Sequence, residues 1–268
     1  MPDNSNNFMA DIEPPEPRFL TVFYLVDTSG SMAGVRIGAA NDALRTCVAT
    51  LKEVQDENPE QGIKMAVLSF STEVKWHAAP TLVDDYTHES LVAGGLTKFG
   101  AACEELESKL HRTSFMAASR SQYAPVFILI SDGEPTDDWK KGLEKLKKNG
   151  WFRGGIRIAI DIDGESDKSV LEAFTGNVET VIKTESAEEL KSMINFVSKV
   201  SSTISSGGGG LASDDPTELI GSKIINPCQE DPSPIPASPE SKPEPTPGST
   251  PIEGGDRSDP FGQEGAIF

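Results

Sequence analysis

Oxygen-bearing side chains alternate along the segment DTSGSM, which occupies residues 27–32 directly after the apolar run FLTVFYLV. Asp27, Ser29 and Ser31 offer one carboxylate and two hydroxyls. These are hard oxygen donors, which suit Mg²⁺ better than zinc or copper. Gly30 between the serines permits a tight backbone that would turn both hydroxyls to one side. The segment therefore predicts part of a cation site, whose remaining ligands must come from elsewhere in the chain.

Two later segments supply matching oxygen groups. Thr97 lies in GGLTKFG, just before an amphipathic stretch, and Asp132 lies in ILISDGEPTDD, directly after an apolar run. In open α/β sheets, ligands bind at the loops that follow the carboxyl ends of parallel strands. We therefore expect one candidate site, built from three loops on one edge of a sheet: Asp27, Ser29, Ser31, Thr97 and Asp132.

The elements that must position these loops follow from the apolar pattern. Between residues 19 and 204, short apolar runs alternate with longer amphipathic stretches, as in repeated strand–helix units. Runs of strand length stand at 19–26, 63–70, 124–131 and 156–162, with a weaker candidate at 178–184. Nearly continuous apolar strands are typical of a parallel sheet covered by helices on both faces. We expect a doubly wound, Rossmann-like α/β fold with a mostly parallel sheet.

Helices are predicted where apolar residues recur at three- and four-residue spacing. Such stripes run over residues 37–54, 99–110 and 139–146, with a short one at 170–174 and a longer one at 190–200. Thr136, Asp137 and Asp138 are predicted to cap the helix that begins at Trp139. The basic run KKGLEKLKK in that helix is interpreted as its solvated face. Residues 71–80 are a candidate antiparallel edge strand, whose length Pro80 should limit.

Composition disfavours several classes of partner. The chain has 42 acidic and 24 basic residues and a formal charge of −18, so we expect no binding to nucleic acid or to an anionic membrane. No apolar run approaches the roughly 20 residues of a membrane helix, and the first residues lack a signal-peptide pattern, which predicts a cytoplasmic protein without membrane insertion. Three widely spaced cysteines suggest neither a disulfide framework nor a zinc site, and Cys47 and Cys103 fit core positions.

The chain is predicted to have three parts. Residues 1–18 are interpreted as a flexible N-terminal segment and residues 19–204 as the α/β domain. Residues 205–268 are interpreted as a disordered, acidic tail that is rich in glycine and proline. This tail begins near GGGG at 207–210 and holds more than half of the 19 prolines. Such a segment cannot bury enough apolar surface to order itself.

The order Asp-x-Ser-x-Ser, then Thr, then Asp resembles the metal-ion-dependent adhesion site of the von Willebrand factor A domain. The resemblance covers roughly residues 19–204. It implies that the five residues of the candidate site bind Mg²⁺, with Mn²⁺ as an alternative. It also implies that an acidic residue of a protein partner completes the coordination. The chain is then a non-enzymatic, Mg²⁺-dependent protein–protein interaction module.

Within that family, the segment SDGEPTDDW most resembles the bacterial tellurium-resistance branch, called TerY-type. This resemblance implies a stress-response or signalling system with a protein kinase and a protein phosphatase as partners. One departure is Leu96 in GGLT, where many relatives have threonine directly after the two glycines. Lys98 then follows the predicted ligand Thr97, and its ammonium would repel a cation nearby.

Several alternatives remain open. The two serines could cap the next helix, and Asp132 with Gly133 could form an ordinary turn, although the full combination favours a metal site. The chain could also be a metal-independent scaffold that recruits partners through its tail. A Mg²⁺-dependent phosphoesterase is a further alternative, disfavoured because no general base accompanies the motif. Asp161 and Asp163, at another predicted strand end, are interpreted as loop residues and not as ligands.

Overall fold

The structure is a computed structural model that describes residues 18–58, 61–116, 122–162 and 167–186, together with residues 188, 189, 192, 195 and 199. The predicted N-terminal segment lies outside the described residues except for Arg18. The predicted tail, Cys228, Asp163 and the apolar residues of the stripe predicted over 190–200 lie outside them as well.

Six strands form one sheet in the order β3-β2-β1-β4-β5-β6. All neighbours are parallel except β2 and β3, which are antiparallel. The strands are β1 (Arg18–Asp27), β2 (Gln61–Phe70), β3 (Val74–Leu82), β4 (Val126–Ser131), β5 (Ile156–Ile162) and β6 (Val181–Thr184). The predicted doubly wound, mostly parallel α/β fold is confirmed.

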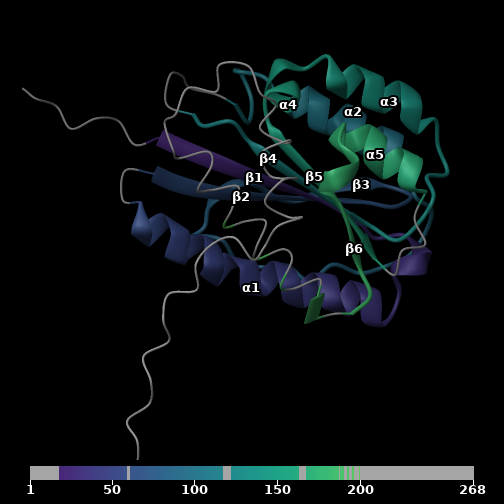
Figure 1. The fold of residues 1–268 in the computed structure, drawn as a ribbon, viewed down its shortest axis with the longest axis horizontal. Coiled ribbons are helices and arrows are strands. Elements are labelled where there is room, and N and C mark those ends of the chain that lie inside the picture. The colour runs from purple at the N-terminus through teal and green to yellow at the C-terminus, as the bar shows by residue number, and fades with distance from the viewer. Residues whose placement is uncertain are drawn as a thin grey trace, which may run out of the picture. The chain divides into compact units, whose positions relative to one another are not determined.

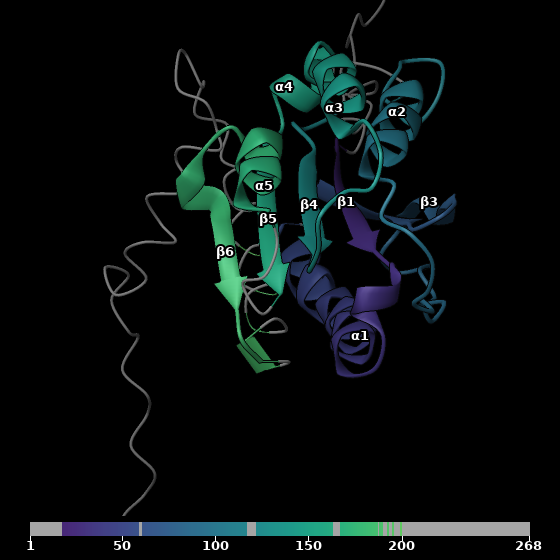
Figure 2. The ribbon, with the colours of Figure 1, turned by 90° about the vertical axis from the view of Figure 1, so that its right-hand side faces the viewer.

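Helices cover both faces of this sheet (Figures 1 and 2). On one face lies α1 (Val35–Glu57), and on the other lie α2 (Phe99–Lys109), α3 (Trp139–Lys147), α4 (Gly150–Arg153) and α5 (Lys168–Thr175). Two short 3-10 helices, η1 (Gly30–Met32) and η2 (Val178–Thr180), complete the described elements. The weaker strand candidate at 178–184 is therefore divided between η2 and β6. No helix in the described ranges combines the length and apolar character that crossing a membrane requires.

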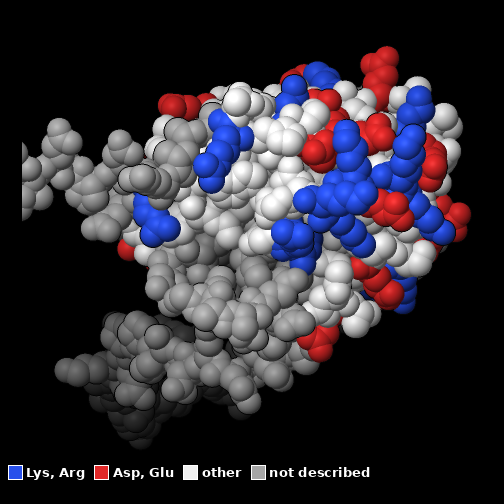
Figure 3. Space-filling model, turned by 90° about the horizontal axis from the view of Figure 1, so that it is seen from above, with Lys and Arg blue, Asp and Glu red and all other residues white. Residues whose placement is uncertain are grey.

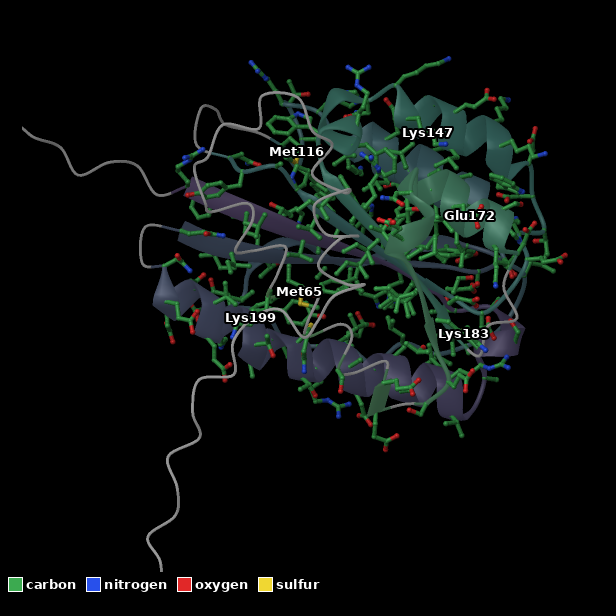
Figure 4. All side chains as sticks on the ribbon, in the orientation of Figure 1. Met65, Met116, Lys147, Glu172, Lys183 and Lys199 are labelled. Carbon is green, nitrogen blue, oxygen red and sulfur yellow. The ribbon has the colours of Figure 1, made fainter. Side chains whose placement is uncertain are left out.

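Successive side chains of each strand point to opposite faces of the sheet, which divides the interior into two cores. In β1, Val22, Tyr24 and Val26 pack on the α1 side, whereas Phe23 and Leu25 pack on the side of α2 to α5. Figure 4 shows Met65 and Met116, which belong to these two cores, on opposite sides of the sheet. Cys47 and Cys103 are fully buried, one in each core, as predicted. With both faces covered, the loops at the strand ends are left as the place for a site.

The edge strand β3 begins three residues later than predicted and runs past Pro80 to Leu82, so Pro80 does not end it. Met65 pairs with Thr81 and Val67 with Ala78, so the register shifts between these two pairs. Pro80 lies in this irregularity. Because a bulge leaves residues without ladder hydrogen bonds, it accommodates a residue that has no amide hydrogen.

One of the three predicted caps of α3, Asp137, acts on α2 instead. Asp137 accepts hydrogen bonds from the backbone amides of Gly100 and Ala101, at 3.0 and 2.9 Å, in the first turn of α2. Asp138, the N-cap residue of α3, makes no side-chain capping bond. The two segments approach so closely that a Cβ on Gly100 would lie 2.8 Å from the carbonyl oxygen of Asp138. The loop after β4 thereby fixes the start of the helix that follows Thr97.

Figure 3 shows lysines and arginines interspersed with acidic side chains on the face formed by α2 to α5. The basic run of α3 belongs to this face, where Lys145 lies 3.1 Å from Glu107 of α2. A groove of about 730 Å³ at the C-terminal ends of α2 and α3 is lined by this pair and by His111, which lies 3.5 Å from Glu107. All five lysines of the run are exposed, which confirms its interpretation as a solvated helix face.

Candidate metal centre

The candidate site lies where the strand order reverses. From β1 the chain crosses to β2 on one side, whereas β4, β5 and β6 follow one another on the other side. Adjacent loops after β1 and β4 therefore lead to opposite faces, which is the position where open α/β sheets bind their ligands. Val26 of β1 is in register with Ile130 of β4, so Asp27 and Ser131 come next to each other at the strand ends.

Asp27 is fully buried at the end of β1. One carboxylate oxygen accepts a hydrogen bond from the backbone amide of Ser29 at 2.8 Å, and the other accepts one from the hydroxyl of Ser131 at 2.7 Å. Ser131 was not predicted, although its position between the strand and Asp132 was a usable signal. Its hydroxyl fixes the carboxylate in place.

A chain of side-chain contacts connects the first loop with the loop after β4. The hydroxyls of Ser29 and Ser31 are 2.9 Å apart, and the Ser31 hydroxyl donates to a carboxylate oxygen of Asp132 at 2.9 Å. The 3-10 turn η1 begins between the two serines and brings their hydroxyls together. Ser29 and Asp132 are buried, whereas Ser31 is exposed, so the cluster opens to solvent on one side.

Thr97, which is 6% exposed, is attached to the same edge mainly through backbone contacts. Its backbone amide donates to the hydroxyl of Thr136 at 3.2 Å, and its carbonyl accepts from the Thr136 amide at 2.8 Å. Its loop also contacts the first loop, because Gly94 donates to the carbonyl of Thr28 at 2.8 Å. The five predicted residues thus share one edge, with Thr97 between the other two loops.

The glycine whose conformation the site requires is Gly95 and not Gly30. Gly95 has a φ of +87°, and a Cβ there would lie 2.3 Å from the hydroxyl oxygen of Thr72. Its carbonyl accepts the backbone amide of Gly30 at 3.0 Å. Gly30 itself is not among the positive-φ glycines, and a Cβ there would make only an ordinary contact. The tight backbone is therefore in the loop before Thr97.

Arg36 is a member of the site that the sequence reasoning missed. One guanidinium nitrogen lies 2.6 Å from a carboxylate oxygen of Asp132 and donates to the carbonyl of Ser31 at 3.2 Å. The Asp132 side chain is fully buried and that of Arg36 is 25% exposed. A usable signal was present, because Arg36 follows the DTSGSM segment closely enough for the first turn of α1 to return its side chain to that loop.

The electrostatics of the site favour a cation. Burial raises the pKa of Asp27, and the nearby charge of Asp132 raises it further, while hydrogen bonds from Ser29 and Ser131 oppose these effects. A positive ion beside both carboxylates would remove the cost of burying their charge. The donors are carboxylate and hydroxyl oxygens, which suit a hard ion such as Mg²⁺. The described residues include no cluster of three or more His, Cys, Asp or Glu side chains that could hold a metal. An ion at this site would therefore depend on hydroxyl oxygens as well as on its two aspartates.

Asp161 and Lys98 are two further residues that the sequence placed at this edge. Asp161 was interpreted as a loop residue, and this is wrong: it lies within β5, buried and in register with Ser131, one strand further from β1. Lys98 is the N-cap residue of α2, and its backbone amide donates to the carbonyl of Ser71 at 3.1 Å. Neither contact places these residues in the hydrogen-bonded chain around Asp132.

Comparison with known proteins identifies the family to which this arrangement corresponds. The family model of the von Willebrand factor type A domain matches residues 22–196, which include every residue of the candidate site. A search of curated proteins finds no match.

Solved structures share the fold at low sequence identity. The von Willebrand factor type A protein from Catenulispora acidiphila is 16% identical, with a TM-score of 0.52, over 69% of this chain and 43% of that one. The pilus adhesin SpaC from Lactobacillus rhamnosus GG, in an open conformation, is 12% identical, with a TM-score of 0.54, over 72% and 31%. Proximal thread matrix protein 1 from the mussel byssus, with a zinc-occupied MIDAS motif, is 18% identical, with a TM-score of 0.51, over 69% and 46%. The chain spans less than half the length of each.

Proposed function

Because the chain belongs to the von Willebrand factor type A family, we propose that it is a non-enzymatic module that binds a protein partner through Mg²⁺. Asp27, Ser29, Ser31, Thr97 and Asp132 would hold the ion, with Mn²⁺ as an alternative. When bound, the ion supplies an electrophilic centre, to which a carboxylate of the partner adds the last ligand.

The observation that carries this proposal is the imbalance of the buried cluster. Its two carboxylates are buried side by side, and its hydroxyls are already linked to one another and to Asp132. Neutral hydroxyls cannot cancel the carboxylate charge, and the guanidinium of Arg36 pairs with Asp132 but not with Asp27, so the cluster favours an external cation. A divalent ion held by few charged ligands keeps affinity for a further anionic ligand, which supports a binding role.

Exposed apolar side chains around the site support a protein as the partner. Val35, Val92 and Leu96 are 79%, 83% and 51% exposed. Val35 adjoins Arg36 in the chain and Leu96 adjoins Thr97, so both belong to segments that form the site. Apolar side chains beside a cation suit a protein surface that presents an acidic residue among apolar ones.

The described histidines give no support to a Mg²⁺-dependent phosphoesterase. His77 contacts the hydroxyl of Ser69 at 2.9 Å, and His88 contacts the side-chain oxygen of Asn41 at 3.0 Å. His111 lies 3.5 Å from Glu107. Each imidazole is therefore engaged away from the oxygen cluster, where a general base for an attacking water would be needed.

The finer assignment follows the resemblance of SDGEPTDDW to the TerY-type branch. We propose a cytoplasmic protein of a bacterial tellurium-resistance or stress-response system, with a protein kinase and a protein phosphatase as partners. The proposed domain comprises residues 19–204, preceded by a flexible segment and followed by a disordered tail. Loss of tellurite resistance on deletion of the gene from its host, restored by wild type but not by a metal-site variant, would support this assignment.

Calorimetric titration of Mg²⁺ into the full chain tests the proposed metal site. We expect saturable binding in the wild type and its loss in Asp27→Asn, which keeps the shape of the side chain but removes the charge. Asp161→Asn is the matched control, because it neutralises another buried aspartate at the same edge and should retain binding. Equal Mg²⁺ affinity in wild type and Asp27→Asn would contradict the site.

Partner capture tests the function and separates it from the alternatives. We expect capture from a host lysate that needs Mg²⁺ and is lost in Asp27→Asn. Capture that does not depend on Mg²⁺ but disappears on deletion of residues 205–268 would favour the metal-independent scaffold. Mg²⁺-dependent hydrolysis of a chromogenic phosphate ester, lost in Asp27→Asn, would favour the phosphoesterase.

A further inference from the structure

A cation of the protein itself is already placed at the candidate metal centre. The guanidinium of Arg36 lies 2.6 Å from Asp132, and its second contact, at 3.2 Å, is with the carbonyl oxygen of Ser31. Both acceptors belong to residues of the proposed metal site. The two oxygens of the Asp132 carboxylate are thus engaged, one by Arg36 and the other by the hydroxyl of Ser31.

The position of Arg36 is unfavourable for its own helix. Arg36 is the second residue of α1, whose first turn contains no acidic residue and whose N-cap, Gly34, makes no side-chain capping bond. The free amides of a helix start carry partial positive charge and disfavour a nearby cation. Helix stability therefore does not explain an arginine at this position, whereas the ion pair with buried Asp132 does.

A metal ion and the guanidinium of Arg36 would compete for the carboxylate of Asp132. A ligated Mg²⁺ would draw electron density from the carboxylate, directly or through a water molecule, and would repel a guanidinium held beside it. The Arg36 side chain is 25% exposed, so it can leave the carboxylate for solvent at modest cost. The buried carboxylate cannot move to solvent in the same way.

We infer that Arg36 is an internal competitor of the metal ion, which neutralises Asp132 in the metal-free protein and must be displaced when the ion binds. This inference rests on the metal site proposed above. Arg36 then sets the ion concentration at which the site fills, and hence the concentration at which a partner's carboxylate can bind. It acts as a positioning residue and not as a ligand of the ion.

Calorimetry of Mg²⁺ binding to the full chain tests the competition. Arg36→Gln removes the charge while keeping much of the side-chain length, and we expect it to bind Mg²⁺ about tenfold more tightly than wild type. The control is Arg45→Gln on the same helix. Arg45 pairs with exposed Asp42 at 2.8 Å, so its loss should change the affinity by less than about twofold.

The stability of the metal-free protein gives a second readout of opposite sign. Without Mg²⁺, Arg36→Gln should melt at a lower temperature than wild type, because Asp132 loses its counter-ion. Saturating Mg²⁺ should then raise its melting temperature more than that of wild type. A residue that merely supported the shape of the site would, when replaced, weaken both the metal-free fold and metal binding.

The outcomes separate this inference from the proposed function. Binding in Arg36→Gln that is tighter than in wild type, or that appears only in the variant, supports the competition. Equal or weaker binding in Arg36→Gln overturns it and leaves the metal site standing. No saturable binding in either protein overturns the metal site and the inference together.

If Arg36→Gln does not fold, Arg36→Lys replaces it, because the lysine ammonium offers a poorer match to the two acceptors. We expect Arg36→Lys to bind a few-fold more tightly, and equal or weaker binding would again overturn the competition.

Discussion

Two buried polar clusters, the candidate metal centre and a group that we call the loop anchor, are built in opposite ways. The loop anchor consists of Asn41 on α1, the backbone of Leu91, His88 and Tyr86. The amide of Asn41 donates to the carbonyl of Leu91 at 2.9 Å and accepts its amide hydrogen at 2.7 Å. His88 contacts the same Asn41 oxygen at 3.0 Å, and its other ring nitrogen lies 3.2 Å from the Tyr86 hydroxyl.

The difference between the clusters lies in charge and in the match of donors to acceptors. In the loop anchor all groups are neutral, because burial lowers the pKa of His88 and raises that of Tyr86. Its donors find acceptors within the cluster. In the candidate metal centre, the guanidinium of Arg36 pairs with Asp132, whereas buried Asp27 accepts hydrogen bonds from the uncharged Ser29 amide and Ser131 hydroxyl, so the carboxylates outnumber the cation beside them. A matched cluster holds the fold together, whereas an unmatched one provides affinity for a ligand.

The candidate metal centre also depends on the loop anchor. The loop anchor fixes Leu91, and the chain continues from there through Gly94 and Gly95 to Thr97. The matched cluster thereby positions a loop of the unmatched one. We therefore expect substitutions in the loop anchor to change stability first, and substitutions in the metal centre to change Mg²⁺ affinity first.

The largest effect is expected for Asp132→Asn. Removal of this buried charge should weaken Mg²⁺ binding by at least about a hundredfold, close to 3 kcal/mol, because the amide is a poorer ligand for a hard cation. Calorimetry measures the affinity, and thermal unfolding in EDTA measures the stability. A loss of stability with unchanged Mg²⁺ affinity would reverse the roles assigned to the two clusters.

Asn41→Ala should have the next largest effect, and on stability. It leaves the buried amide and carbonyl of Leu91 without their partner, which should cost about 2 kcal/mol of unfolding free energy. Urea unfolding in EDTA measures the loss. Asp42→Ala is the control on the same helix, because its exposed pair with Arg45 should contribute less than about 0.5 kcal/mol. Equal losses in the two variants would remove the distinction.

Gly95→Ala should cost about 1 to 2 kcal/mol, because its φ of +87° is strained for alanine and the added Cβ would meet Thr72. Gly94→Ala is a closely matched control, since no atom lies within 4 Å of a Cβ at that position and its φ is not positive. Paired melting curves measure the difference. A Gly95→Ala protein as stable as Gly94→Ala would show that the loop accepts another conformation.

The smallest effect concerns pH. Burial lowers the pKa of His88 below 6.5, so the unfolded chain binds the proton more tightly than the folded protein. This contribution to stability is complete above pH 6.5 and is lost as the pH falls through the lowered pKa. Because His88 is partly exposed, we expect a loss of less than about 1 kcal/mol.

Thermal melts of the wild type, of His88→Gln and of the control His111→Gln measure this dependence on pH. His77 has a pKa lowered by burial in the same direction, so His88→Gln should reduce the dependence without abolishing it. His111→Gln controls for the substitution itself, because His111 lies outside the loop anchor, beside Glu107. An unchanged pH dependence in His88→Gln would show that the imidazole is not held neutral in the loop anchor.

The sequence by itself determined the strands of the sheet, the positions along the chain of α1, α2, α3 and α5, and the edge that carries the five oxygen residues. Strand and helix periods are local properties, since each follows from the spacing of apolar residues along one segment. The apolar runs predicted the strands, and strand ends in a parallel sheet share an edge whatever their separation in the chain. That is why Asp27 and Asp132 could be assigned to one site.

Only the tertiary structure decided which polar groups meet. Arg36 contacts Asp132 and Asp137 caps α2 because segments distant in the chain pack within hydrogen-bond distance. The close approach of Gly100 to the loop before α3 and the strained backbone at Gly95 have the same origin. A side chain's partner depends on the relative placement of whole elements, which no local spacing encodes. The sequence therefore predicted the donors of the site, whereas packing decided their charge balance.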